Sequence, residues 1–173
     1  MEITKETGVV VVLNTQNKDA LDKIEKDFRN MDVKTFGFEY DINCSSDSMV
    51  VKVAQNDDSR VIEKKDLYII LSFIIGYFSE ISKEFNNILT GVISAGEISI
   101  AEKSAKRFII EHKQFPRIML DDSAFNFITN DMVINYSEKK EMNELNKLDT
   151  FIYPDDLVKR IKKDEFHFIS ACD

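Results

Sequence analysis

The stretch that decides the fold is "GVVVVL", residues 8–13, a continuous run of β-branched and aliphatic side chains. Apolar residues at every position predict a strand that is covered on both faces and lies at the centre of a sheet. The segment that follows, residues 17–31, predicts a helix. Its apolar side chains recur at helical spacing: Ala20, Leu21, Ile24 and Phe28. A central strand is therefore followed by an amphipathic helix.

A hairpin is predicted next. Residues 33–42, "VKTFGFEYDI", alternate between two rows of side chains, and the alternation resumes at Met49 after the polar stretch "NCSSDS". Two such runs around a short polar segment indicate a β-hairpin whose turn carries Asp47. From the residues alone, Asp47 is either a turn residue that bonds its own backbone or a metal ligand.

The second half again alternates helices and strands. We predict a buried apolar helix over about residues 65–85, a strand in residues 88–98, a helix in residues 99–113 and a short strand in residues 117–121. The second of these helices has an apolar stripe of Ile100, Ala101, Ala105, Phe108 and Ile109. Beyond Asp122 the signals weaken. We predict a charged helix in residues 137–148, a short helix in residues 157–164 and a terminal strand in residues 166–170.

Length and order define the fold class. A chain of 173 residues suits one core, so we treat residues 1–173 as a single domain. The order of elements predicts an α/β fold, an α+β sandwich in which helices pack on a mostly antiparallel sheet. The net charge of -8 has the wrong sign for a general nucleic-acid binder.

Other features exclude further classes. The two cysteines, Cys44 and Cys172, and the two histidines do not have zinc-site spacing. The longest apolar run, residues 67–78, is shorter than the roughly 20 residues that a membrane span needs. We find no secretory signal, so we expect a cytoplasmic protein with reduced thiols.

The order of these segments resembles a known family. The "SSDS" hairpin, the apolar helix, "GVISAGE", the helix with "AKR" and "FPRIMLD" are similar to the class III nucleotidyl cyclase domain, particularly the bacterial branch that includes pyrimidine cyclases of antiphage signalling. The similarity covers Val9 to Asp121, and the late "KDEFHFIS" resembles a further strand of the family. The resemblance implies a ferredoxin-like palm and a homodimer that converts a nucleoside triphosphate to a 3',5'-cyclic nucleotide and pyrophosphate.

That chemistry explains the residue types which the family uses. The ribose 3'-hydroxyl attacks the α-phosphate, so carboxylates must hold Mg²⁺ or Mn²⁺ beside the phosphates. Further hydrogen-bond donors must stabilise the negative charge that develops on the phosphate oxygens. By resemblance, Asp47 matches the hairpin metal ligand, and Asn14 stands where the first strand should carry a second aspartate. Arg107 matches the catalytic arginine, and Lys103 stands where an asparagine is usual.

The chain departs from the family pattern at several positions, and these departures bear on whether it is an active cyclase. Asn14 lacks a charge, the family's arginine before Gly91 is Thr90, and the loop that normally precedes the helix is almost absent. Asp41 stands where many class III cyclases have a lysine, so the base preference is open. Lys103 and Arg107, with Glu111 one turn further on, also fit a solvent-exposed helix face that carries i,i+4 ion pairs.

We therefore favour a degenerate cyclase-fold protein. It would be a nucleotide-sensing or protein-interaction module that dimerises and acts in bacterial or phage defence signalling. The alternative is an active cyclase with a minimal site, in which Asp47 holds the metal and Arg107 of the partner chain stabilises the transition state. A third hypothesis is an unrelated α/β domain with an accidental resemblance.

Overall fold

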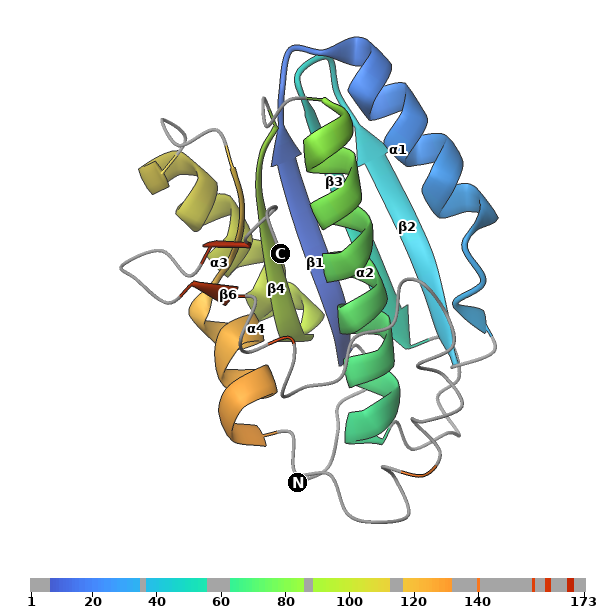
Figure 1. The fold of residues 1–173 in the computed structure, drawn as a ribbon, viewed down its shortest axis with the longest axis vertical. Helices are drawn as coiled ribbons and strands as arrows, with labels where there is room; N and C mark the ends of the chain where they lie inside the picture. Colours follow the sequence, from blue (N-terminus) through green and yellow to red (C-terminus); the bar gives the residue numbers. More distant parts are fainter. Residues whose placement is uncertain are drawn as a thin grey trace.

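The computed structural model describes residues 7–34, 37–55, 63–85, 89–112, 117–131, 140, 157, 161–162 and 168–169 (Figure 1). The elements within these residues are β1 (Thr7–Asn14), α1 (Lys18–Asn30), β2 (Phe38–Cys44), β3 (Ser48–Gln55), α2 (Lys64–Glu84), β4 (Thr90–Glu97), α3 (Ile98–His112), β5 (Ile118–Leu120), α4 (Asp122–Asn126), the π-helical turn η2 (Phe127–Asp131), β6 (Ile161–Lys162) and β7 (Phe168–Ile169).

One seven-stranded sheet runs through these elements, in the order β2-β3-β1-β4-β5-β7-β6. Strand β1 is central and pairs antiparallel with both β3 and β4, while β2 pairs antiparallel with β3. A βαββαβ chain with this order is the ferredoxin-like arrangement. Among the described strands only the β4–β5 pair is parallel. The predicted fold class is therefore confirmed.

The strand register brings three segments to one end of the sheet. Asn14, the last residue of β1, lies opposite Ser48 at the start of β3 and opposite Thr90 at the start of β4. The β2–β3 turn therefore lies beside the end of β1. The predicted hairpin is confirmed, although β2 begins at Phe38 rather than at residue 33.

The front face of the sheet, defined by Val9, Val11 and Leu13 of β1, carries the larger core. Helices α1 and α2 cover it (Figure 1). Helix α1 begins where the Asn17 side chain accepts a hydrogen bond from the Ala20 amide, which is a standard N-cap. Helix α2 is buried along most of its length, as predicted, and its apolar side chains pack in the front core. Within the described ranges, no helix is long and apolar enough to cross a membrane.

The back face, defined by Val10 and Val12 of β1, carries a smaller core under α3. The helix side chains in this core are Ile98, Ala101, Ala105 and Ile109. The prediction that Ile100 belongs to the apolar stripe is wrong, because Ile100 is 61% exposed. The buried row begins at Ile98, and Ile100 lies on the opposite side of the helix.

The buried carboxylate of Asp121 joins four elements at the end of β5. Its two oxygens accept hydrogen bonds from the hydroxyls of Ser94 in β4, Ser104 in α3 and Ser123 in α4. The Ala124 amide also donates to it at 3.0 Å, so Asp121 caps α4. Asp121 is only 2% exposed, and its hydrogen bonds replace the water that it loses on burial.

The region after Asp121 differs most from the prediction. Helix α4 and η2 form where the sequence signals were weak. The short helix predicted for residues 157–164 is wrong in part, since residues 161–162 form β6 and pair with β7. Strand β7 confirms the predicted terminal strand. Most of the charged helix predicted for residues 137–148, together with Cys172 and His167, lies outside the described residues.

Candidate functional site

The two predicted metal-site residues lie at the same end of the sheet, on segments that touch. The amide of Thr15, next to Asn14, donates to the backbone carbonyl of Asp47 at 2.9 Å. The hairpin turn is closed by the Ser45 amide, which donates to the Ser48 carbonyl at 2.8 Å. Asp47 is exposed in this turn, and Asn14 is partly buried. The predicted proximity of these two positions is thus a property of the fold.

The ligand atoms at this end of the sheet are poor ones for Mg²⁺. Asp47 supplies one carboxylate, which accepts a hydrogen bond from the Ser45 hydroxyl at 3.3 Å. The Ser45 and Ser48 hydroxyls bond to each other at 2.6 Å. Asn14 supplies an uncharged amide. No group of three His, Cys, Asp or Glu residues suited to a metal occurs in the described part of the chain. One carboxylate does not fit a firm Mg²⁺ or Mn²⁺ site.

Polar groups in the loop between β1 and α1 form hydrogen bonds within the loop and with the start of α1. The Thr15 hydroxyl accepts the Asn17 amide at 3.1 Å, and the Asn17 side chain caps α1. This loop forms the third side of the sheet end that carries Asn14 and Asp47. Its hydrogen bonds give the end of β1 a defined path into the helix.

Lys103 and Arg107 lie on the outer side of α3, four residues apart on one exposed face, as the spacing predicted. The Arg107 Nε donates to Glu111 at 2.8 Å, and this hydrogen bond raises the pKa of the guanidinium. The Arg107 side chain is 81% exposed. The expected ion-paired helix face therefore exists. Within the described residues, no hydrogen bond or ion pair joins Lys103 or Arg107 to Asn14 or Asp47.

A second charge network ties α3 to the sheet. Glu102 pairs with Lys106 at 2.6 Å and with Lys52 of β3 at 2.5 Å. The hydrogen bonds from Lys106 and from Lys52 lower the pKa of the Glu102 carboxyl. The sequence analysis missed this link, although Lys52 stands in the outward row of the alternating strand. The position of Lys52 in this row was the sequence signal from which the link could have been predicted.

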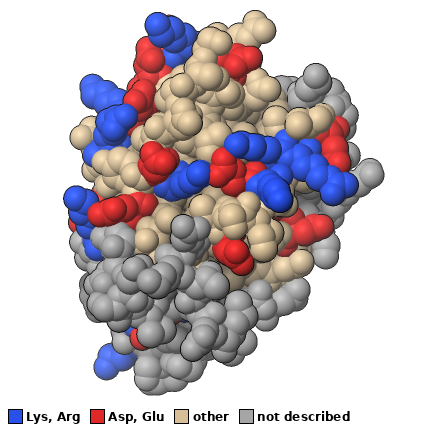
Figure 2. All heavy atoms as spheres, turned by 180° about the vertical axis from the view of Figure 1, so that it is seen from behind, with Lys and Arg blue, Asp and Glu red and all other residues tan. Residues whose placement is uncertain are grey.

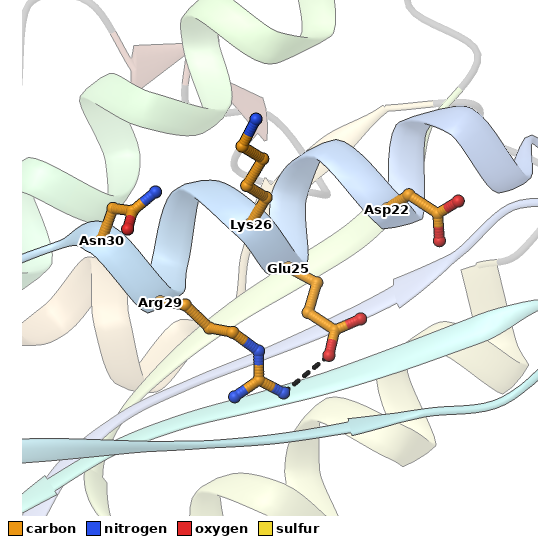
Figure 3. A pocket seen from close by; sticks show the side chains of 5 residues that line it. All are labelled: Asp22, Glu25, Lys26, Arg29 and Asn30. Carbon is orange, nitrogen blue, oxygen red and sulfur yellow. Dashed lines mark hydrogen bonds and ion pairs between the residues drawn. The ribbon is translucent and has the colours of Figure 1, made fainter.

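A shallow cavity of about 470 Å³ lies along α1, lined by Asp22, Glu25, Lys26, Arg29 and Asn30. Figure 3 shows these side chains leaving the helix toward different sides, with Arg29 paired to Glu25 at 2.6 Å. Hydrogen bonding from Arg29 lowers the pKa of Glu25. Burial raises the pKa of the neighbouring Cys44 thiol, which makes it a weaker nucleophile. The cavity does not converge on a reactive group.

No family model matches this chain, and no curated protein matches it.

Proposed function

We propose that this chain is a degenerate nucleotidyl-cyclase-fold protein, a dimerising module that senses a nucleotide or binds a protein partner. The observation that carries the proposal is the set of ligand atoms at the end of β1. The ferredoxin-like scaffold holds Asn14 beside Asp47, yet the position next to Asp47 has an amide where metal catalysis needs a second carboxylate. A role in bacterial or phage defence signalling follows from the sequence resemblance.

The alternative function is an active cyclase with a minimal site. It is favoured by two observations: Asp47 is exposed at the end of the sheet, and the Arg107 guanidinium is open to a ligand or a partner chain. Arg107 would be a donor to the phosphate oxygens. Its pairing with Glu111 is an exposed i,i+4 ion pair, which is weak enough to exchange for phosphate.

A product assay separates the two functions. Purified protein is incubated with Mn²⁺ and each of ATP, GTP, CTP and UTP, and products are read by chromatography and mass spectrometry. We expect no cyclic nucleotide from any of them. A cyclic product that disappears in Asp47→Ala would overturn the degenerate function and establish the minimal cyclase.

A further inference from the structure

Strand β2 forms one edge of the sheet, and one side of its backbone is open. It is the last strand in the sheet order and pairs only with β3 among the described strands (Figure 1). The Ser45 amide donates to the Ser48 carbonyl, so the turn fixes which backbone groups face β3. Because these groups alternate along an antiparallel pair, those of Tyr40, Ile42 and Cys44 face outward. Within the described residues, these outward groups have no hydrogen-bond partner.

The start of β2 follows the same alternation. The Phe38 amide donates to the Val33 carbonyl at 3.2 Å, so it faces away from β3. Helix α1 meets the front of the strand, where the Tyr40 hydroxyl and the Cys44 thiol donate to it at 2.6 Å and 3.8 Å. Among the described residues, these side chains, and not the backbone of β2, make the hydrogen bonds to α1. The edge is therefore able to pair with a further strand.

The back-facing side chains of β2 form an acidic row along this edge. Alternation along the strand turns Glu39 and Asp41 to the α3 side, where both are exposed. Basic side chains also lie on this side of the molecule (Figure 2). The one opposite Asp41 is Lys52 of β3, whose amine pairs with Glu102 of α3 at 2.5 Å. Within the described residues, the carboxylates of Glu39 and Asp41 have no ion-pair or hydrogen-bond partner.

We infer that the edge of β2 binds an extended basic segment of a protein partner, which adds to the sheet as a further strand. The outward backbone groups of Tyr40, Ile42 and Cys44 supply main-chain hydrogen bonds. Back-facing residues of the segment are Lys or Arg and lie beside Glu39 and Asp41. Front-facing residues are apolar and lie beside Tyr40 and Ile42, which are only partly buried. The inference rests on the protein-binding part of the proposed function and specifies the partner.

Charge disfavours a second copy of this chain at the same edge. Two β2 strands that pair along their open edges set their back-facing rows side by side, so Glu39 and Asp41 of both copies meet. Like charges opposite each other on a sheet oppose pairing. A basic segment instead meets this row with the opposite charge, and the net charge of -8 attracts it over a longer range.

Synthetic peptides test the edge directly. The probe is a labelled, capped peptide that alternates Lys and Val over the seven residues of β2, and its matched control has the same residues in two blocks. We expect fluorescence anisotropy to show roughly tenfold or tighter binding of the alternating peptide, since only this order presents one basic and one apolar row. Hydrogen exchange of the Tyr40 and Ile42 amides should slow when it binds.

N-methylation of the peptide separates strand addition from charge attraction. Only every second amide of an added strand faces β2. Methylation of one alternate set of amides should therefore abolish binding, while methylation of the other set should leave it unchanged. This test uses the wild-type protein, so it does not depend on whether a variant folds.

Charge reversal tests the acidic row. Glu39→Lys with Asp41→Lys should weaken binding of the Lys/Val peptide roughly tenfold or more, and the variant should bind an alternating Glu/Val peptide instead. The matched control is Glu80→Lys with Glu97→Lys, which makes the same change in net charge at exposed positions of α2 and β4. It should bind the Lys/Val peptide like the wild type. Circular dichroism of each variant checks that it is folded.

The inference fails if no peptide binds, if the block peptide binds as tightly as the alternating one, or if both methylated sets bind equally. Unchanged exchange of the Tyr40 and Ile42 amides would also overturn it. Exchange that slows with protein concentration in the absence of peptide would assign the edge to a second copy. The product assay above is independent: a cyclic product overturns the degenerate function and leaves strand binding intact, and a lack of strand binding leaves the product assay unaffected.

Discussion

The neighbourhood of Asn14 and Asp47 permits a direct test at the scale of one residue. Asn14→Asp would place a second carboxylate beside Asp47, so we expect Mn²⁺ to bind about tenfold more tightly, measured by electron paramagnetic resonance of the free ion. Activity should not appear, because the loop that would complete a nucleotide pocket is also missing from the sequence.

Asn30→Asp is the matched control, since it adds the same charge at the far end of α1. Its Mn²⁺ affinity should equal that of the wild type. Equal Mn²⁺ affinity in Asn14→Asp would show that positions 14 and 47 do not share a ligand, and cyclic product from this variant would contradict the degenerate function.

Tyr77 gives a pH-dependent prediction. Its hydroxyl donates to Asp27 at 2.8 Å, and burial, then this hydrogen bond, raises the phenol pKa above its usual value of 10.0. The folded state therefore holds the proton more tightly than the unfolded state. Its contribution to stability is complete below about pH 10 and is lost as the pH rises further.

Tyr77→Phe should lower the free energy of unfolding at neutral pH by about 1 kcal/mol. It should also flatten the decline of stability above about pH 10, measured by urea unfolding. Tyr40→Phe, which loses a hydrogen bond to the Arg29 carbonyl instead, is the control. An alkaline decline as steep in Tyr77→Phe as in the wild type would contradict this assignment.

Residues set by local periodicity were predictable. Lys103 and Arg107 share a face because four residues make about one helical turn. The placement of Asp47 in a turn followed from the alternation around it. The prediction that Ile100 is buried was wrong. Residues 98–110 contain enough apolar side chains for more than one apolar stripe, and packing against the sheet selects the stripe that starts at Ile98.

At the scale of elements, the Asp121 carboxylate fixes how α3 and α4 sit on the sheet. Asp121→Ala removes the acceptor for three hydroxyls and one amide, and it leaves the Ser94 hydroxyl and the Ala124 amide buried without that partner. We expect a loss of about 3 kcal/mol in the free energy of unfolding, measured with urea. Asp122→Ala, at the exposed next position, should change stability by less than about 0.5 kcal/mol.

Asp121→Asn refines this prediction, because its amide keeps one acceptor oxygen that can still cap α4. The Asn variant should therefore lie between the wild type and Asp121→Ala. Equal stability of Asp121→Ala and Asp122→Ala would show that the serine hydroxyls find other partners, and that the carboxylate does not hold these elements together.

Short elements were the least predictable. Residues 157–164 have a local helical pattern, yet residues 161–162 pair with β7 as a strand. Pairing with β7, which itself pairs with the distant β5, overrides weak local propensity when few residues are involved. Long elements such as α1 and α2 were predicted correctly because one buried face or a fully apolar run leaves few alternatives.

At the scale of the whole molecule, the sheet order was less predictable than its elements. The continuous apolar run of residues 8–13 placed β1 at the centre, and the hairpin placed β3 next to β2. The positions of β5, β6 and β7 depend on pairings that leave little local pattern, since these strands have only two or three residues.

The central place of β1 has a consequence for how the protein is made. Gly8 pairs with Ala54 on one side and with Gly96 on the other, so β1, which is synthesised before β3 and β4, waits for both neighbours. Until β3 and β4 leave the ribosome, an apolar strand with two unpaired edges can join a strand of another nascent chain. A segment that is buried in the finished protein is thus exposed to misassociation during its synthesis.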